Sequence, residues 1–179
     1  GSAEQLAGLG VHAWWFAPQV TGDNPEPARD AQRITVMNAN LFEGRADAQE
    51  LVDAVRDNHV DILVLEEITP PLLEEADGLG LAQLLPERVG EPEYDVAGTM
   101  ILANQPLTDH VRLRTTFQGW EARFGTLTVL GVHPVAPVDP AGWRADHAAI
   151  LERAEADHAD LIVGDMNATP DHEPLRRLD

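Results

Sequence analysis

The chain has 179 residues, which is enough for one domain with a sizeable core, and 44% of them are apolar, which excludes a disordered chain. It carries 31 acidic residues against 12 basic ones, for a formal charge of -19, and every basic residue is an arginine. Such a surface repels nucleic acid and anionic lipid unless cations intervene. Binding of an anionic substrate therefore requires a metal ion or an arginine at the binding site. A salty habitat would favour the same composition without any bearing on function. The chain contains no cysteine, which excludes disulfides and thiolate chemistry.

Residues 1–32 are predicted to form an N-terminal arm and linker ahead of the folded domain. Residues 6–18 are mostly apolar, but they are too few for a membrane span, which takes about 20. The adjacent Trp14 and Trp15, followed by a polar, proline-containing linker at 21–32, are typical of the interfacial end of a transmembrane helix that begins upstream of this sequence. The alternative is an arm that packs on the domain.

The remaining chain, residues 33–179, is predicted to be one domain in which the hydrophobic pattern alternates between strands and helices. The pattern predicts a strand at 33–40, a helix beginning near Asp47, a strand at 61–65, one or two short helices within 72–85, strands at 98–103, 111–116 and 126–132, a helix at 143–157, a strand at 161–163 and a short final helix at 171–178. This order predicts an α/β sandwich with a mixed sheet inside and helices outside.

Two of these helices carry clear local signals. Asp47 with Glu50 three residues later forms a capping box, which starts a helix with apolar residues on one face. In the helix at 143–157, His147 shares its face with Trp143 and Ile150. His147 is therefore predicted to pack in the core rather than to bind a ligand.

Polar side chains follow the ends of four predicted strands. They are Asn40, then Glu66 and Glu67, then His133, and finally Asp165 and Asn167. Ligand sites in layered α/β folds are built at strand ends, so these positions are expected to form one site. Two carboxylates at the mouth of a buried strand are costly without a cation, which indicates a divalent metal, although one or both could point to solvent instead.

The last of these positions allows two interpretations. Asp165 and Asn167 are two residues apart, so an extended backbone would point both side chains the same way and let them hold a water and a phosphoryl oxygen side by side. The alternative is a strand that runs into an Asx-type turn with no ligand.

Together the strand ends resemble the endonuclease/exonuclease/phosphatase family, a magnesium-dependent group that includes DNase I-like nucleases, inositol-phosphate phosphatases and sphingomyelinases. The resemblance runs from residue 33 to the end and is strongest in Ala39-Asn40-Leu41, in residues 61–67 and in Gly164-Asp165-Met166-Asn167. It implies a DNase I-like α/β sandwich with mixed sheets inside and helices outside. The family pattern continues to a further Asp and a terminal Ser-Asp-His, so the domain is expected to lack its C-terminal strands and that histidine.

The resemblance also implies roles for individual residues. Glu67 falls on the metal-ligand glutamate and Asn40 on the asparagine that helps to hold metal and phosphate, with Mg²⁺ as the cofactor and Mn²⁺ as an alternative. The resemblance further implies that His133 contacts the phosphoryl oxygens, that Asp165 orients the attacking water, and that Asn167 binds the scissile phosphate. Glu66 stands where the family usually has glutamine.

Within the family, the Trp-Trp segment, the linker and residues 132–137 resemble bacterial membrane-anchored members with an extracytoplasmic catalytic domain. This implies hydrolysis of a phosphoester or pyrophosphate bond at the extracytoplasmic face of the cell membrane, for example in a polyprenyl pyrophosphate. The lack of a basic patch disfavours DNA, so a nuclease is the weaker alternative. The other alternative is a non-catalytic module that binds a metal or a partner. Oligomeric state is left open.

Overall fold

The computed structural model of the chain describes residues 33–168, and the elements reported below lie in the compact unit that begins at Ile34. Two four-stranded sheets form its centre. The first contains β1 (Val36–Asn40), β2 (Ile62–Glu66), β4 (Thr99–Ala103) and β3 (Glu87–Glu91), in that order. The second contains β5 (Leu107–Arg112), β6 (Trp120–Phe124), β7 (Leu127–Val132) and β8 (Leu161–Gly164), also in that order.

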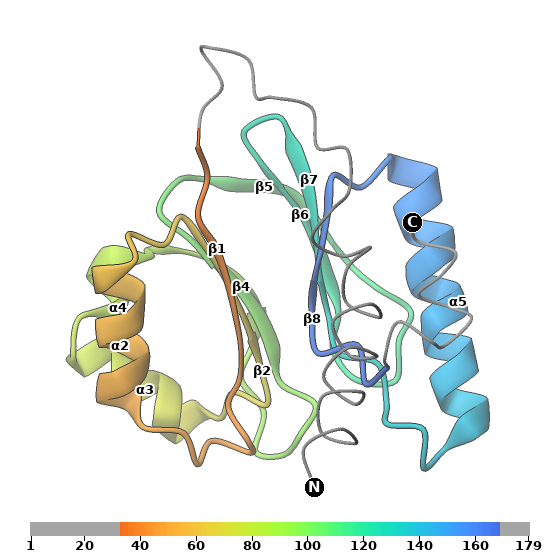
Figure 1. The fold of residues 1–179 in the computed structure, drawn as a ribbon, viewed down its shortest axis with the longest axis horizontal. Helices are drawn as coiled ribbons and strands as arrows, with labels where there is room; N and C mark the ends of the chain where they lie inside the picture. Colours follow the sequence, from red (N-terminus) through yellow and green to blue (C-terminus); the bar gives the residue numbers. More distant parts are fainter. Residues whose placement is uncertain (1–32, 169–179) are drawn as a thin grey trace, which may run out of the picture. The chain divides into compact units, whose positions relative to one another are not determined.

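Helices cover the outer faces of both sheets (Figure 1). The first sheet is covered by α2 (Ala48–Asp57), α3 (Pro70–Gly78) and α4 (Leu81–Leu84), and the second by α5 (Pro140–Asp157). The predicted sandwich is therefore confirmed, with two mixed sheets rather than one. The predicted arm and linker at 1–32 and the predicted helix at 171–178 lie outside the described residues.

The strand β2 shows how the sequence pattern positions the site. All five of its residues are buried. Leu63 and Leu65 pack toward the helices, whereas Ile62 and Val64 pack between the two sheets. Because side chains alternate along a strand, Glu66 continues the row that faces the second sheet. A run with both faces covered is what the continuous apolar segment predicted.

Parallel pairing brings the ends of neighbouring strands to one edge of each sheet. In the first sheet β1 runs parallel to β2, with Asn40 opposite Glu66. In the second, β7 runs parallel to β8, with Val132 opposite Gly164. The polar residues that follow these four strands therefore leave each sheet from a shared end.

Several boundaries differ from the predictions. The sequence pattern missed β3 and β6, because their charged residues interrupt the apolar signal. The strand expected at 111–116 lies earlier, as β5, where a register shift between Thr108 and Val111 marks a bulge. The first helix expected within 72–85 begins two residues earlier, as α3, with Pro70 and Pro71 in its first turn, where a helix needs no N–H donor from them. The predicted cap of α2 is confirmed, since the side chain of Asp47 accepts from the backbone N–H of Gln49 and of Glu50.

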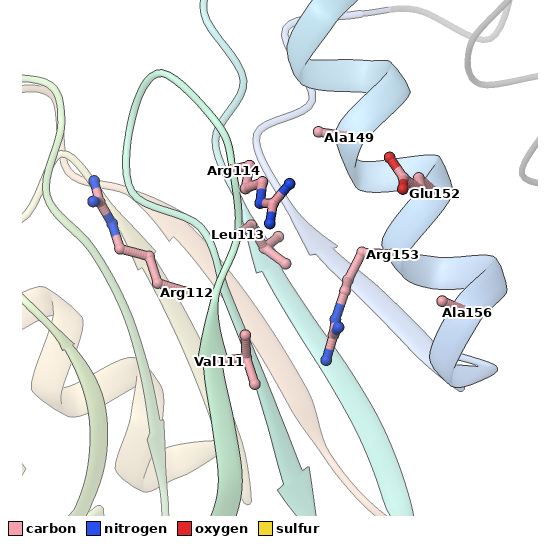
Figure 2. Close-up of a pocket in the computed structure, with 8 residues that line it drawn as sticks. All are labelled: Val111, Arg112, Leu113, Arg114, Ala149, Glu152, Arg153 and Ala156. Carbon is pink, nitrogen blue, oxygen red and sulfur yellow. The ribbon is translucent and has the colours of Figure 1, made fainter.

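A hollow of about 300 Å³ lies on the outer side of the second sheet, between α5 and the end of β5 (Figure 2). None of the predicted site residues lines it. Arg153 reaches from α5 toward the sheet in Figure 2 and binds Glu121 of β6 through Nε–Oε2 (2.7 Å) and Nη2–Oε1 (3.0 Å). Glu121 is only 5% exposed, so this ion pair keeps a buried carboxylate compensated.

We therefore expect Arg153→Ala to destabilise the domain by about 2 kcal/mol, because it leaves the buried carboxylate of Glu121 without these two hydrogen bonds. Thermal unfolding at neutral pH measures this as a lower Tm. Arg144→Ala is the matched control, since Arg144 is an exposed arginine on the same helix with no ion pair recorded among the described residues. Equal Tm values for the two variants would contradict the prediction.

Candidate active site

Asn40 joins the strand ends of the two sheets. Its Nδ2 donates to Glu67 Oε1 (3.0 Å) and to Asp165 Oδ2 (3.0 Å), although Asp165 lies 125 residues further along the chain. Nε2 of His133 lies 3.9 Å from the same Oε1 of Glu67. The structure therefore brings four of the predicted site residues to one place.

The turns that follow β1 and β2 aim these side chains. The Oδ1 of Asn40 accepts from the backbone N–H of Phe42 (2.9 Å), and Oε2 of Glu67 accepts from that of Glu43 (2.8 Å). Phe42, Glu43 and Glu67 all have positive φ, as does Asn167 in the segment after β8. Residues other than glycine seldom adopt a positive φ, because it strains the backbone. Backbone strain of this kind is concentrated at functional sites. The backbone contribution of Phe42 and Glu43 left no signal in the sequence.

The segment after β8 is a turn rather than an extended strand. Gly164 has φ +150°, and a Cβ there would lie 1.9 Å from the carbonyl oxygen of Val132, so only glycine fits. The backbone N–H of Asn167 donates to Oδ1 of Asp165 (3.0 Å). The expectation that an extended backbone aligns the two side chains is therefore wrong, and the Asx-type turn is present. Nδ2 of Asn167 donates to the carbonyl oxygen of Pro134 (2.9 Å), which sets it beside the loop that begins at His133.

Glu66 is fully buried, so the alternative that it points to solvent is wrong. Neither of its carboxyl oxygens has a hydrogen-bond partner within the described part of the chain. Burial raises the pKa of Glu66 to about 8, and the negative charges of Asp165 and Glu67 act in the same direction. The nearby backbone N–H groups of Asp165 and of Glu66 itself lower this pKa by less. The carboxyl is therefore largely protonated at neutral pH.

Thr99 accompanies Glu66 in the interior. The two residues are opposite each other in the β2–β4 ladder, and the hydroxyl of Thr99 is buried without a hydrogen-bond partner in the described residues. Sequence reasoning missed this polar neighbour because Thr99 begins an otherwise apolar strand, where a threonine is ordinary.

His133 is buried and faces the same site. Burial lowers its pKa, while the charges of Asp165 and Glu67 and the backbone of Val96 oppose that shift. Its ring packs against Phe117 with the ring centroids 5.2 Å apart. The imidazole is therefore neutral at neutral pH and can donate a hydrogen bond through only one of its nitrogens.

The donor set suits a hard cation. Glu67, Asp165 and Asn40 offer oxygen atoms, and none of the hydrogen bonds or ion pairs of the two carboxylates recorded among residues 33–168 involves an arginine. Over the same residues no group of three or more His, Cys, Asp or Glu side chains is arranged to hold a metal ion. Mg²⁺ needs only one or two carboxylates and completes its shell with water and substrate, so Glu67 and Asn40 fit it.

Comparison with known proteins bears on the family. The sequence profile of the Endonuclease/Exonuclease/phosphatase family matches residues 37–179. The chain belongs to this family. Membership confirms the resemblance seen in the strand-end motifs and supports a hydrolase of the phosphoester-cleaving kind. No curated protein sequence matches the chain significantly.

Solved structures similar to this family member share its fold. Sphingomyelinase C from Streptomyces griseocarneus aligns with a TM-score of 0.62 at 15% identity, covering 83% of this chain and 69% of that one. D. rerio TDP2, humanized by 14 mutations, aligns at 0.62 and 11% identity, covering 76% and 67%. A β-hairpin deletion mutant of beta toxin from Staphylococcus aureus aligns at 0.58 and 10%, covering 82% and 71%. These likenesses confirm the DNase I-like fold class.

Proposed function

We propose that this chain hydrolyses a phosphoester or pyrophosphate bond with the help of a divalent metal, Mg²⁺ or alternatively Mn²⁺. The observation that carries the proposal is the Asn40 amide, which holds Glu67 and Asp165 together with His133 beside them. Phosphoryl transfer needs an in-line water, a cation on the non-bridging oxygens and donors for the developing charge. The site offers one group for each of these tasks.

The proposal assigns each site residue a role that is compatible with its contacts. Asp165 accepts a hydrogen bond from the attacking water and takes its proton as the new P–O bond forms, while the bond to the leaving oxygen breaks. Asn167 keeps one amide hydrogen for a phosphoryl oxygen, because the other is donated to Pro134. The neutral His133 donates to a second phosphoryl oxygen. A metal held by Glu67 and Asn40 would neutralise negative charge on the phosphoryl group.

The proposed substrate is lipid-linked, for example a polyprenyl pyrophosphate at the extracytoplasmic face of the cell membrane. Exposed apolar side chains in loops that carry site residues, or that bond to the segment after Glu67, support an amphiphilic substrate. Phe42 (66% exposed) follows β1, Val138 (93%) lies in the loop after His133, and Tyr94 (81%) belongs to a loop bound to Ile68. The formal charge of -19 disfavours DNA.

The proposal places attachment to the membrane in a segment upstream of this sequence. Within the part of the chain that the structure describes, no helix is both long and apolar enough to cross a bilayer.

A substrate panel tests the activity and its metal dependence. We expect the chain to release phosphate from a polyprenyl pyrophosphate when Mg²⁺ is present. Phosphate release should stop when EDTA removes the metal and should recover when Mg²⁺ is restored. Glu67→Gln is expected to weaken Mg²⁺ binding, measured by calorimetry, at least about tenfold because it removes a charged oxygen ligand. Glu43→Gln is the control, since that side chain pairs with Arg45 on the same turn.

Other outcomes distinguish the alternatives. Turnover that persists in EDTA would contradict the proposed metal dependence. Preferred cleavage of DNA, with a steep dependence on salt, would replace the lipid substrate by a nuclease function. Mg²⁺ binding without turnover of a phosphodiester, a sugar phosphate, DNA or the pyrophosphate would favour the non-catalytic module.

A further inference from the structure

One face of α5 contacts both loops that carry the phosphate-binding side chains. Trp143, Asp146 and His147 lie three and four residues apart and are all buried. Side chains at this spacing share a face of a helix. The catalytic roles proposed above use none of the three.

Asp146 holds the loop that follows β7. Its Oδ2 accepts from the backbone N–H of Val135 (3.0 Å), two residues after His133. Its Oδ1 accepts from the backbone N–H (2.9 Å) and the hydroxyl (3.0 Å) of Thr116. One buried carboxylate therefore fixes the His133 loop and anchors it to the segment between β5 and β6.

Trp143 holds the segment that follows β8. Its Nε1 donates to the carbonyl oxygen of Asn167 (3.1 Å). The indole is itself oriented, because His147 packs on it with ring centroids 4.4 Å apart and donates from Nδ1 to the Trp143 carbonyl oxygen (2.8 Å). Asn167 has φ +46°, a conformation that persists only where its surroundings hold it.

The two contacts close a ring of hydrogen bonds. From α5 the ring passes through Asp146 to Val135 and Pro134, crosses from Pro134 to the Asn167 side chain, and returns from the Asn167 carbonyl to Trp143. Because α5 is a rigid element that supports both loops, the separation of Asn167 and His133 is set by one helix face.

We propose that Trp143 and Asp146 are positioning residues, which hold Asn167 and the His133 loop in the geometry that phosphoryl transfer requires. This inference rests on the proposed function. A displacement of about 1 Å at a reacting group costs on the order of 10²-fold in rate, so loss of one contact is expected to lower kcat more than KM.

Trp143→Phe tests the proposal, because it keeps a buried ring and removes only the indole N–H and part of the ring volume. We expect kcat to fall about 10- to 100-fold with KM changed less than twofold. Trp120→Phe is the matched control, since its Nε1 makes a bond of the same length, 3.1 Å, to Gln118, which is not one of the predicted site residues. The control should lose similar stability and keep its kcat.

A second measurement of the effect of Trp143→Phe does not depend on catalytic activity. In ¹⁵N NMR of the substrate-free protein, we expect the side-chain amide signals of Asn167 to shift in Trp143→Phe and to stay in place in Trp120→Phe. If the wild type hydrolyses no substrate, the proposed function fails, and the Asn167 signals alone decide whether Trp143 positions that residue.

The remaining outcomes are decisive. Unshifted Asn167 signals would overturn the inference, whatever happens to kcat, because any loss would then arise elsewhere. Shifted signals with an unchanged kcat in an active enzyme would overturn it as well. If Trp143→Phe does not fold, Asp146→Asn is read by the same two measurements, since it replaces an acceptor oxygen of the same ring by a donor.

Discussion

In Asp165→Ala, we expect turnover to fall roughly 10²- to 10⁴-fold, the range over which a positioned proton acceptor contributes to catalysis. Asp165 bonds both to the Asn40 amide and to the turn that carries Asn167. Its removal takes away the group proposed to orient the water. The fold should survive, because Asp165 follows β8 in a loop and its side chain is only partly buried.

The measurement is kcat on the best substrate of the panel, together with Tm and far-UV circular dichroism. Asp160→Ala is the matched control: Oδ2 of Asp160 accepts a backbone N–H from Thr128 (2.8 Å) just before β8, at the opposite end of that strand from the site. The control should retain turnover. Turnover that persists in Asp165→Ala would show that the water is oriented by another group.

The second large effect concerns stability. Burial raises the pKa of Glu66 from 4.5 to about 8. Between these values the folded state binds more protons than the unfolded state, so stability falls as pH rises from about 4.5 to about 8. The shift corresponds to a loss on the order of 5 kcal/mol above that range. Glu66→Gln removes the ionisation while keeping the shape, and it should be more stable than wild type at pH 9.

Urea unfolding at pH 5 and pH 9 in EDTA measures this difference. At pH 5 the two proteins should differ little, because the wild-type carboxyl is protonated in the fold. Glu91→Gln, at an exposed carboxylate on β3, should show no such dependence on pH. A stability gain of Glu66→Gln that is equal at both pH values would show that the Glu66 pKa is ordinary.

Much of the secondary structure could be predicted from local patterns. The buried strand β2 and the capped helix α2 were both predicted, because their signals lie within a few neighbouring residues. β3 and β6 were missed for a physical reason. Glu121 in β6 is buried only because Arg153, on a helix later in the chain, neutralises it, and Arg88 in β3 pairs with Asp77 on α3. When the ion-pair partner of a charged residue lies on a distant element, the local sequence does not show it, and the charged residue is interpreted as part of a loop.

Local patterns in the sequence were enough to indicate the family, the alternation of strands and helices, and the polar residues at each strand end, since all of these depend on residues close together along the chain. The packing of the layers was needed to reveal that the Asn40 amide joins Glu67 to Asp165, that Glu66 is buried without a partner among residues 33–168, and that Trp143 bonds to Asn167. These contacts arise when two sheets stack and a helix packs on one of them. Their distances depend on how hydrophobic layers fit together, a property that the spacing of residues in the chain does not specify.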